Sequence, residues 1–413
     1  FMLVNGIMIP TTAFLIEKYS VRRLFLVAMG LFTTGTLIAG MAPAFFVLII
    51  ARMVQASGSA IMMPLLMTVM LISFPVHKRG TAMGIFGLIL MAAPAIGPTL
   101  SGIIVQYTHW RMLFFLVAPI AFIILILGFF LLKDKKEKQA IYLDKISLIL
   151  SSIGFGGLLF GFSSAGDQGW GSPQVYGTII IGTISLVLFI TRQGKLTRPM
   201  LNFRVFKYPM FSLAAATTMV VNMALFSGML LLPIYVQTIR GISPIEAGLM
   251  LLPGALVMAF MSPITGRLFD KYGGRVLAIT GLTIMIVTTY LFSQLTMETP
   301  YTYLMTLNAV RNFGISMVMM PVSTNGLNQL PPSYYPHGTA MNNTLNQISA
   351  AIGTALLITI MSVRTEYYAQ QMVRDLQRQG EALTETALKQ IEHASMLEGI
   401  NDKENYIKIF IGE

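Results

Sequence analysis

One multi-helix unit occurs twice in this chain. The segment Gly80-Thr81-Ala82-Met83 recurs letter for letter as Gly338-Thr339-Ala340-Met341, 258 positions later. Two further pairs recur in the same order at nearly the same offset: Glu17-Lys18-Tyr19 with Asp270-Lys271-Tyr272, and Arg52 before Met63-Pro64 with Arg311 before Met320-Pro321. Three matches in register indicate a duplication. In an apolar chain, a parallel repeat of several helices is typical of transporters with a substrate site between the halves.

The composition independently predicts a membrane protein. Hydrophobic residues make up 55% of the chain and charged residues 11%, whereas a soluble domain carries about 25% charged residues. About 20 apolar residues are needed to cross roughly 30 Å of hydrocarbon. Twelve such segments are expected, at approximately 1–16, 24–42, 45–72, 81–106, 111–132, 146–164, 174–191, 211–238, 246–266, 276–295, 301–327 and 339–362. The sequence therefore predicts an all-α, multi-pass protein with the lipid bilayer as its partner.

The net charge of +11 follows the topology of the chain. Basic residues gather on alternate loops, beginning with Lys18, Arg22 and Arg23, and the loops between them carry none. Positive residues stay on the cytoplasmic side, so the 17–23 turn is expected there and no nucleic-acid partner is expected. The chain has no cysteine, its four histidines are scattered, and it lacks a nucleotide-binding P-loop. We therefore expect no metal site, no cofactor and no enzymatic activity.

The repeat also predicts how the chain is divided. Residues 1–140 would form an N-terminal bundle and 209–413 a C-terminal bundle, with two inserted helices and a linker in 141–208. The repeated turn lies between the second and third helices of a six-helix half only if one helix is missing upstream. We expect a fragment of a fourteen-helix protein, carrying helices 2–6 and 9–13 and lacking the first helix and most of the last. Residues 364–405 would be an amphipathic extracellular segment.

Motifs of glycine, proline and charged residues mark the turns and several helices. The turn from Gly266 through Asp270 and Gly273 to Arg275 follows the pattern Gly-x-Leu-x-Asp-Arg/Lys-x-Gly-Arg-Arg. Its first copy keeps Glu17, Arg22 and Arg23 but has Ala13 and Ser20 in place of glycines. Arg52 and Gln55 begin a segment that follows Arg-x-x-Gln-Gly-x-Gly, with Ala56 in place of one glycine.

These motifs resemble those of the major facilitator superfamily, specifically its fourteen-helix drug:proton antiporters, among them the lincomycin and multidrug exporters of Gram-positive bacteria. The resemblance covers essentially the whole chain. It implies a major facilitator fold in the bacterial cytoplasmic membrane. It also identifies Gly87, Gly97, Pro98 and Gly102 with the family's antiporter motif, although Ser101 replaces one glycine. The second half has no matching proline, so we expect this segment to serve transport rather than folding.

The charged motif residues have two possible interpretations. The first interpretation makes the two repeated turns, 17–23 and 266–275, cytoplasmic gating turns: the carboxylate caps a helix N-terminus while the arginines hold neighbouring helix ends. In the second interpretation these turns are solvated loops. Arg52 lies deep in its apolar segment, where a charge costs roughly 2.5–3.5 kcal/mol, so it should face a wet cavity or have a partner. The resemblance implicates Arg52 in proton exchange, and Gln55, Arg311 and Asn222 are candidates for the same proton and substrate pathway. Each could instead be a structural helix contact.

The function implied by the resemblance is proton-coupled efflux of lipophilic drugs or toxic small molecules by alternating access, from a monomer. A metabolite exporter, a proton symporter of the same fold, and a membrane sensor or scaffold remain alternatives. None of the seventeen acidic residues lies deep in a predicted membrane segment. The related antiporters carry an aspartate in their first helix, so we expect the proton-carrying carboxylate there, near enough to Arg52 to pair with it.

Overall fold

The computed structural model describes residues 1–133, 142–296 and 298–379, and in these ranges the chain is helical without any strand. The α-helices are α1 (Met2–Lys18), α2 (Val21–Gly40), α3 (Phe45–Ser73), α4 (Arg79–Tyr107), α5 (Met112–Leu131), α6 (Lys145–Gln168), α7 (Pro173–Lys195), α8 (Pro209–Ile234), α9 (Pro244–Tyr272), α10 (Gly274–Phe292), α11 (Tyr301–Asn328) and α12 (Tyr335–Gln379). Short helical turns are η1 (Val76–Lys78), η2 (Phe203–Lys207), η3 (Tyr235–Ile239) and η4 (Pro332–Tyr334).

These helices coincide with the twelve apolar segments that the sequence predicts. Nine of the helices in the described ranges are long and apolar enough to cross a membrane. Their outward faces carry large apolar side chains, among them Ile286, which is 70% exposed, and Phe130, which is 74% exposed. In water such a surface would be unfavourable, whereas against lipid it is expected. The prediction of an all-α, multi-pass membrane protein is confirmed.

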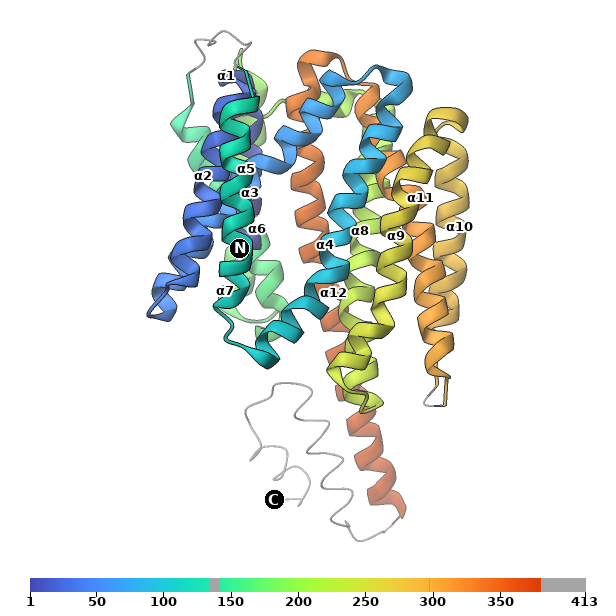
Figure 1. Ribbon diagram of the computed structural model, residues 1–413. Coiled ribbons are helices and arrows are strands. Elements are labelled where there is room, and N and C mark those ends of the chain that lie inside the picture. Colours follow the sequence, from blue (N-terminus) through green and yellow to red (C-terminus); the bar gives the residue numbers. More distant parts are fainter. Residues whose placement is uncertain (134–141, 297, 380–413) are drawn as a thin grey trace.

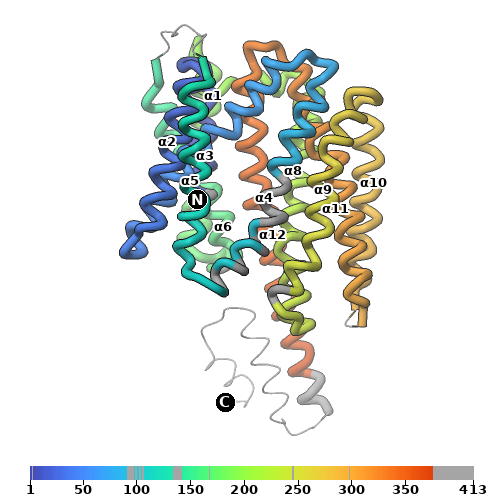
Figure 2. Tube along the Cα trace, viewed as in Figure 1, coloured from blue at the N-terminus to red at the C-terminus, as the bar shows by residue number. Residues whose placement is uncertain are grey.

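The helices are arranged as two bundles with a helix pair inserted in the sequence between them (Figures 1 and 2). In the first half α2 packs on α3 and α5, and in the second half α11 packs on α8, α9 and α10. Between the halves, α4 lies along α9, and α12 contacts both α1 and α3. The inserted helices α6 and α7 pack on each other, and α6 also contacts α1 and α12. The insertion therefore lies beside the junction of the halves.

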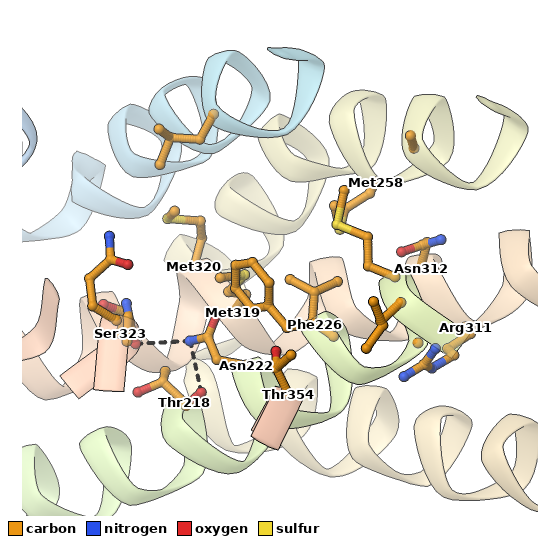
Figure 3. A pocket seen from close by; sticks show the side chains of 18 of the residues that line it. Thr218, Asn222, Phe226, Met258, Arg311, Asn312, Met319, Met320, Ser323 and Thr354 are labelled. Atoms are coloured by element: carbon orange, nitrogen blue, oxygen red, sulfur yellow. Dashed lines mark hydrogen bonds between the residues drawn. The ribbon is translucent and has the colours of Figure 1, made fainter. Parts of the chain in front are cut away.

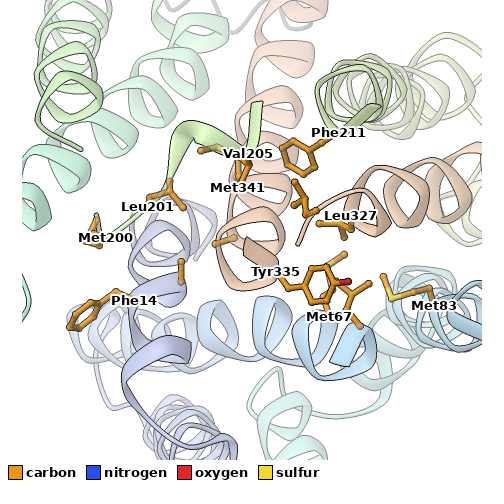
Figure 4. Close-up of a cluster of buried hydrophobic side chains, with 14 of the residues drawn as sticks. Phe14, Met67, Met83, Met200, Leu201, Val205, Phe211, Leu327, Tyr335 and Met341 are labelled. Atoms are coloured by element: carbon orange, nitrogen blue, oxygen red, sulfur yellow. The ribbon is translucent and has the colours of Figure 1, made fainter. Parts of the chain in front are cut away.

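A cluster of buried hydrophobic side chains joins the two halves at the ends that the charge pattern places on the cytoplasmic side (Figure 4). Phe14 and Met67 come from the first half, Phe211 and Leu327 from the second, and Leu201 from the linker before η2. Leu201 is fully buried, and the others retain at most 4% exposure. Burying such a side chain stabilises by about 1.5–3 kcal/mol. This end of the molecule is therefore held closed by packing.

Helix α12 is longer than the predicted membrane segment 339–362. It continues without a break to Gln379 and extends below the other helices in Figure 1. The polar segment predicted at 364–405 therefore begins as a continuation of α12. The rest of that predicted segment lies outside the described residues.

Candidate functional site: a cytoplasmic clasp and a central cavity

The carboxylate of Asp270 caps a helix of the opposite half. Its Oδ1 accepts a hydrogen bond from the backbone N–H of Gly80 at 2.8 Å, and its Oδ2 accepts one from that of Thr81 at 2.8 Å. The Thr81 hydroxyl donates a third, at 2.7 Å, to Oδ2. The first N–H groups of a helix have no partner within the helix and carry a partial positive charge. Asp270, at the end of α9, satisfies two of these groups in α4 and so ties the halves together.

Glycines let α4 and α9 approach closely enough for this contact. A Cβ added to Gly266 would lie 2.3 Å from the backbone oxygen of Gly80, and one added to Gly84 would lie 2.6 Å from that of Ser262. The Ser262 hydroxyl donates a hydrogen bond of 2.9 Å to the Gly84 carbonyl. Gly87 continues the same face, because an added Cβ there would meet the Ser262 side chain. Glycine at positions 84, 87 and 266 is therefore required by the contact between the halves.

The corresponding contact in the other copy of the repeat joins Glu17 and His337. His337 Nε2 lies 3.0 Å from Glu17 Oε1, and His337 Nδ1 accepts a hydrogen bond from the backbone N–H of Asn202. Since Nδ1 is an acceptor, the ring proton is on Nε2 and donates to the carboxylate. Glu17 lies in the last turn of α1, and His337 lies in the first turn of α12. Each turn carboxylate thus contacts the start of a helix in the opposite half.

Arg79 adds a third cytoplasmic contact between the halves. Its Nη1 donates to Asn328 Oδ1 at 3.0 Å and to the Tyr335 hydroxyl at 2.9 Å, and its Nε donates to the Phe74 carbonyl. Arg79 is only 7% exposed. We refer to the contacts made by Asp270, Glu17 and Arg79 together as the cytoplasmic clasp, because the charge pattern predicts that this end of the molecule faces the cytoplasm.

The remaining turn residues lie outside the clasp contacts described above. Arg22 donates to the Phe129 carbonyl at 2.9 Å and lies over the Phe129 ring, so it holds the end of α5 within the first half. Arg23 lies in the first turn of α2, with its backbone N–H bonded to Ser20 Oγ. Gly273 has φ of +78°, which favours glycine. Arg275 is exposed.

A cavity of about 680 Å³ lies deeper in the molecule, lined by α3, α4, α8, α9, α11 and α12 (Figure 3). Met63, Met67 and Leu90 come from the first half, and the other lining residues come from the second. Small-molecule sites commonly enclose about 300–1,000 Å³. Six methionines and Phe226 line the cavity. Because methionine is flexible and polarizable, such a wall can adapt to apolar ligands of different shape.

Arg311 brings the only charge among the described residues that line this cavity. Its Nη2 donates to the backbone carbonyl of Ala224, and the guanidinium lies 5.8 Å from the centre of the Phe292 ring. A Cβ on Gly228 would overlap the Nη1 atom, so glycine at this position of α8 makes room for the guanidinium. Figure 3 shows Arg311 and Asn312 at the same end of the cavity.

Asparagines line the cavity and also connect its helices. Asn222 Nδ2 donates to the Thr218 carbonyl at 2.9 Å and to Asn346 Oδ1 at 2.8 Å, which joins α8 to α12. Asn342 Nδ2 donates to Ser323 Oγ at 3.1 Å, which joins α12 to α11. Asn222 therefore lines the cavity and also forms a contact between helices, the two roles that the sequence left open for it.

Arg52 and Gln55 are not among the described residues that line the cavity. Arg52 Nη1 donates to Gln55 Oε1 at 2.7 Å, and Gln55 Nε2 donates to Thr36 Oγ1 at 2.8 Å. The Arg52 guanidinium also lies 4.8 Å from the centre of the Phe1 ring and 5.7 Å from that of Phe114. The structure therefore separates the two repeat mates: Arg311 lines the cavity, while Arg52 lies within the first bundle.

The segment that resembles the antiporter motif divides into two parts. Gly87 is buried against α9, whereas an added Cβ on Gly97 would meet nothing within 4 Å. The backbone of α4 is helical through Pro98 and Gly102. The side-chain surroundings of Pro98 and Gly102 lie outside the described part of the structure.

Several residues of the clasp and cavity have no sequence signal of their own. His337 and Arg79 occupy matching positions of the repeat, directly before Gly338 and Gly80, and this offset could have identified them. Gly228 and Phe226 carry no such sequence signal. Their roles depend on contacts between helices far apart in the sequence.

Two homologous helical bundles, closed at one end around a central cavity, define the fold of a secondary transporter. A model of the major facilitator superfamily matches residues 1–354. The chain is 51% identical over 372 residues to the uncharacterized MFS-type transporter YhcA of Bacillus subtilis, covering 90% of this chain and 70% of that protein. It is 44% identical over 370 residues to the lincomycin resistance protein LmrB of Listeria monocytogenes, covering 90% and 79%.

Among solved structures, the human organic anion transporter MFSD10 is similar in fold. Its TM-score is 0.64 at 14% identity, over 87% of this chain and 76% of that one. On the family match and these identities, the chain belongs to the major facilitator superfamily and is a multi-pass transporter of the cell membrane.

Proposed function

We propose that this protein exports lipophilic, drug-like small molecules across the bacterial cytoplasmic membrane by alternating access, driven by protons. The supporting observation is that polar contacts clasp the two halves at their cytoplasmic ends while an adaptable cavity, lined from both halves, lies deeper. The 44% identity to a protein named for lincomycin resistance supports a drug-like substrate. In this proposal the protein acts as a monomer, without catalytic chemistry.

The clasp would be the gate of the cycle. With Asp270 on α4 and Glu17 on α12, the cavity is closed toward the cytoplasm. Release of both carboxylates would let the halves separate there and admit substrate. Capping hydrogen bonds are worth about 0.5–2 kcal/mol each, which is small enough for a bound ligand or a proton to shift the balance between two states.

Proton coupling would use the first bundle, where Arg52, Gln55 and Thr36 form a hydrogen-bonded chain. A cation inside the membrane segment can hold or release a carboxylate partner as that partner is protonated. The coupling site would then lie within the first bundle, apart from the cavity between the halves, and the two would communicate through the clasp.

The test uses the full-length protein in a host that lacks its main drug efflux pumps. We expect raised resistance to lincomycin or to another lipophilic compound in an efflux panel, abolished by a protonophore. In acid-loaded inverted vesicles, adding the substrate should release protons.

The alternatives give different results in the same assays. Proton uptake in the direction of substrate movement would indicate a symporter, and active transport of a metabolite but of no drug would indicate a metabolite exporter. Normal membrane insertion with no coupled flux of any compound would contradict transport and favour a sensor or scaffold.

A further inference from the structure

We propose that the cavity selects amphiphilic organic anions, with Arg311 binding the anionic group and the methionine-rich wall holding the apolar body. This inference rests on the proposed export function and narrows it to a substrate class. It concerns the chemistry of the cavity and is independent of how transport is driven.

The charge of the cavity favours an anion. Arg311 is the single charged side chain among the described lining residues, and no aspartate or glutamate is among them. Neither the Asp144–Arg192 ion pair nor the Glu17–His337 contact, both in the described ranges, involves Arg311. A cationic ligand would therefore meet a positive charge and no carboxylate, in surroundings where charges are poorly screened. An anionic ligand would supply the missing counter-charge.

The Arg311 guanidinium is held in place by the protein, but the described hydrogen bonds engage few of its N–H donors. Of its five N–H donors, the described hydrogen bonds engage one, from Nη2 to the Ala224 carbonyl. Its Nε is buried without any partner. Glycine at position 228 lets the Nη1 edge pack against the backbone of α8, since an added Cβ there would overlap this atom. A planar guanidinium that is fixed by one hydrogen bond and has further N–H donors without partners is suited to bind a carboxylate or a sulfonate.

A second unused donor lies on the same face of α11. Asn308 is 5% exposed, and its Nδ2 has no hydrogen-bond partner. Asn312 Nδ2 donates to Asn308 Oδ1 at 3.2 Å, which fixes the amide so that Nδ2 is the atom left over. Residues three apart are neighbours on a helix, so the unpaired amide of Asn308 lies one turn from Arg311. Buried donors without partners are uncommon in native proteins, so Asn308 adds a second unpaired polar group next to the guanidinium.

The apolar part of the remaining wall, which lies beside the asparagines described above, determines the apolar body of the ligand. Met229, Met258, Met319 and Phe226 line the cavity together with Leu225, Leu230 and Leu251. These residues contribute apolar, largely adaptable surface and no specific hydrogen bonds. The expected substrate is therefore a bulky hydrophobic molecule with one acidic group, recognised closely at that group and loosely elsewhere.

The experiment measures binding of three probes that share one aromatic body, using purified full-length protein in nanodiscs. The probes are pyrenebutyrate, its methyl ester and the corresponding pyrenebutyl trimethylammonium ion. For the unmodified protein we expect the carboxylate to bind about tenfold or more tightly than the ester, and the cation most weakly. Arg311→Gln should remove the difference between carboxylate and ester, while Arg311→Lys keeps part of it.

The matched control is Arg364→Gln, which removes the same charge from an exposed position of α12 and should leave the preference unchanged. Thermal unfolding of each variant separates loss of binding from loss of the fold, and Arg311→Lys tests the charge if Arg311→Gln does not fold. Equal binding of the three probes by the unmodified protein, or an unchanged preference in a folded Arg311→Gln variant, would overturn this inference and leave export intact. Failure of every probe to bind, together with absent efflux, would overturn both.

Discussion

Asp270 and Gly80 lie 190 positions apart in the sequence, yet the carboxylate of one accepts the backbone N–H of the other at 2.8 Å. The contact places a negative charge at the positive end of α4, where it is stabilised by unpaired N–H groups. Because Asp270 belongs to the second half and Gly80 to the first, the same bond that caps a helix also joins the halves. A helix cap that joins the two halves can hold them together when it is formed and let them separate when it is broken.

Replacing Asp270 with asparagine should weaken the clasp without disturbing the bundles. Asparagine retains one acceptor oxygen but loses the charge and the second acceptor. We expect a loss of about 1 kcal/mol, and hence about a fivefold shift toward a state with separated cytoplasmic ends. The chain has no cysteine, so spin labels on His77→Cys and Tyr272→Cys, both exposed positions, report this opening by pulsed electron resonance. An unchanged distribution of distances between the two labels would show that Asp270 does not help to hold this end closed.

Two glycines in different halves should differ in how much stability is lost when a larger side chain replaces them. A Cβ at Gly353 would lie 2.8 Å from the Met223 backbone, whereas one at Gly97 meets open space. We therefore expect Gly353→Leu to lower the unfolding temperature by several degrees and Gly97→Leu to leave it nearly unchanged. If Gly97→Leu is stable but does not transport, the glycine is needed in another conformation of the cycle. Equal destabilisation by the two substitutions would contradict the packing described.

The sequence predicted the helices well because apolar length alone determines a membrane segment. The twelve segments, the repeat and the two inserted helices are all expressed in local composition or in matching letters. The turn carboxylates Asp270 and Glu17 were also visible. Their partners were not, because each carboxylate crosses to the other half, and no local pattern encodes a contact between residues so far apart.

The residues that line the cavity were even harder to predict from the sequence. Family motifs direct attention to Arg52, and the repeat then identifies Arg311 as its equivalent. Only the structure shows that Arg311 lines the cavity. The position of its guanidinium depends on two residues of α8, the small Gly228 and the hydrogen-bonded carbonyl of Ala224. Complementarity between a glycine in one helix and a guanidinium in another leaves no periodic signal.

The ion pair between Asp144 and Arg192 should make the inserted helices sensitive to pH. Arg192 Nε donates to Asp144 Oδ2 at 2.6 Å and Nη2 to Oδ1 at 3.0 Å. The hydrogen bonds from Arg192 hold the pKa of the Asp144 carboxyl well below its usual value. A carboxyl with a lowered folded-state pKa contributes stability above its unfolded pKa, about 4, and loses it as the pH falls through the folded value.

Asp144→Asn should therefore speed hydrogen exchange in the first turns of α6 at pH 7. The difference from the unmodified protein should shrink progressively as the pH is lowered below about 4, after correction for intrinsic exchange rates. The effect will be modest because the pair is partly exposed to solvent. A difference that stays constant down to the lowest pH measured would show that the charge of Asp144 is not what stabilises this end of α6.

Glu17 and His337 should be energetically coupled. Their side chains approach to 3.0 Å across the halves, and the His337 side chain is only 5% exposed. Glu17→Ala, His337→Ala and the double variant form a cycle in which unfolding is measured by chemical denaturation in detergent. We expect a coupling of about 1 kcal/mol. Additive effects of the two substitutions would mean that the contact contributes no stability, and the clasp would then depend on Asp270 and Arg79.

Arg52 should be required for proton-driven efflux and dispensable for substrate binding, because it lies apart from the cavity. Its guanidinium combines a hydrogen bond to Gln55 with contacts to two aromatic rings. Arg52→Ala removes both, and Arg52→Lys keeps the charge but lacks the planar fork. We expect efflux to be lost in the first variant and poorly rescued in the second, while the affinity of both for a cavity ligand stays within about twofold of the unmodified protein. Arg364→Ala, at an exposed position, serves as the control at matched expression. Normal efflux by Arg52→Ala, or loss of ligand binding parallel to loss of efflux, would exclude a separate coupling site in the first bundle.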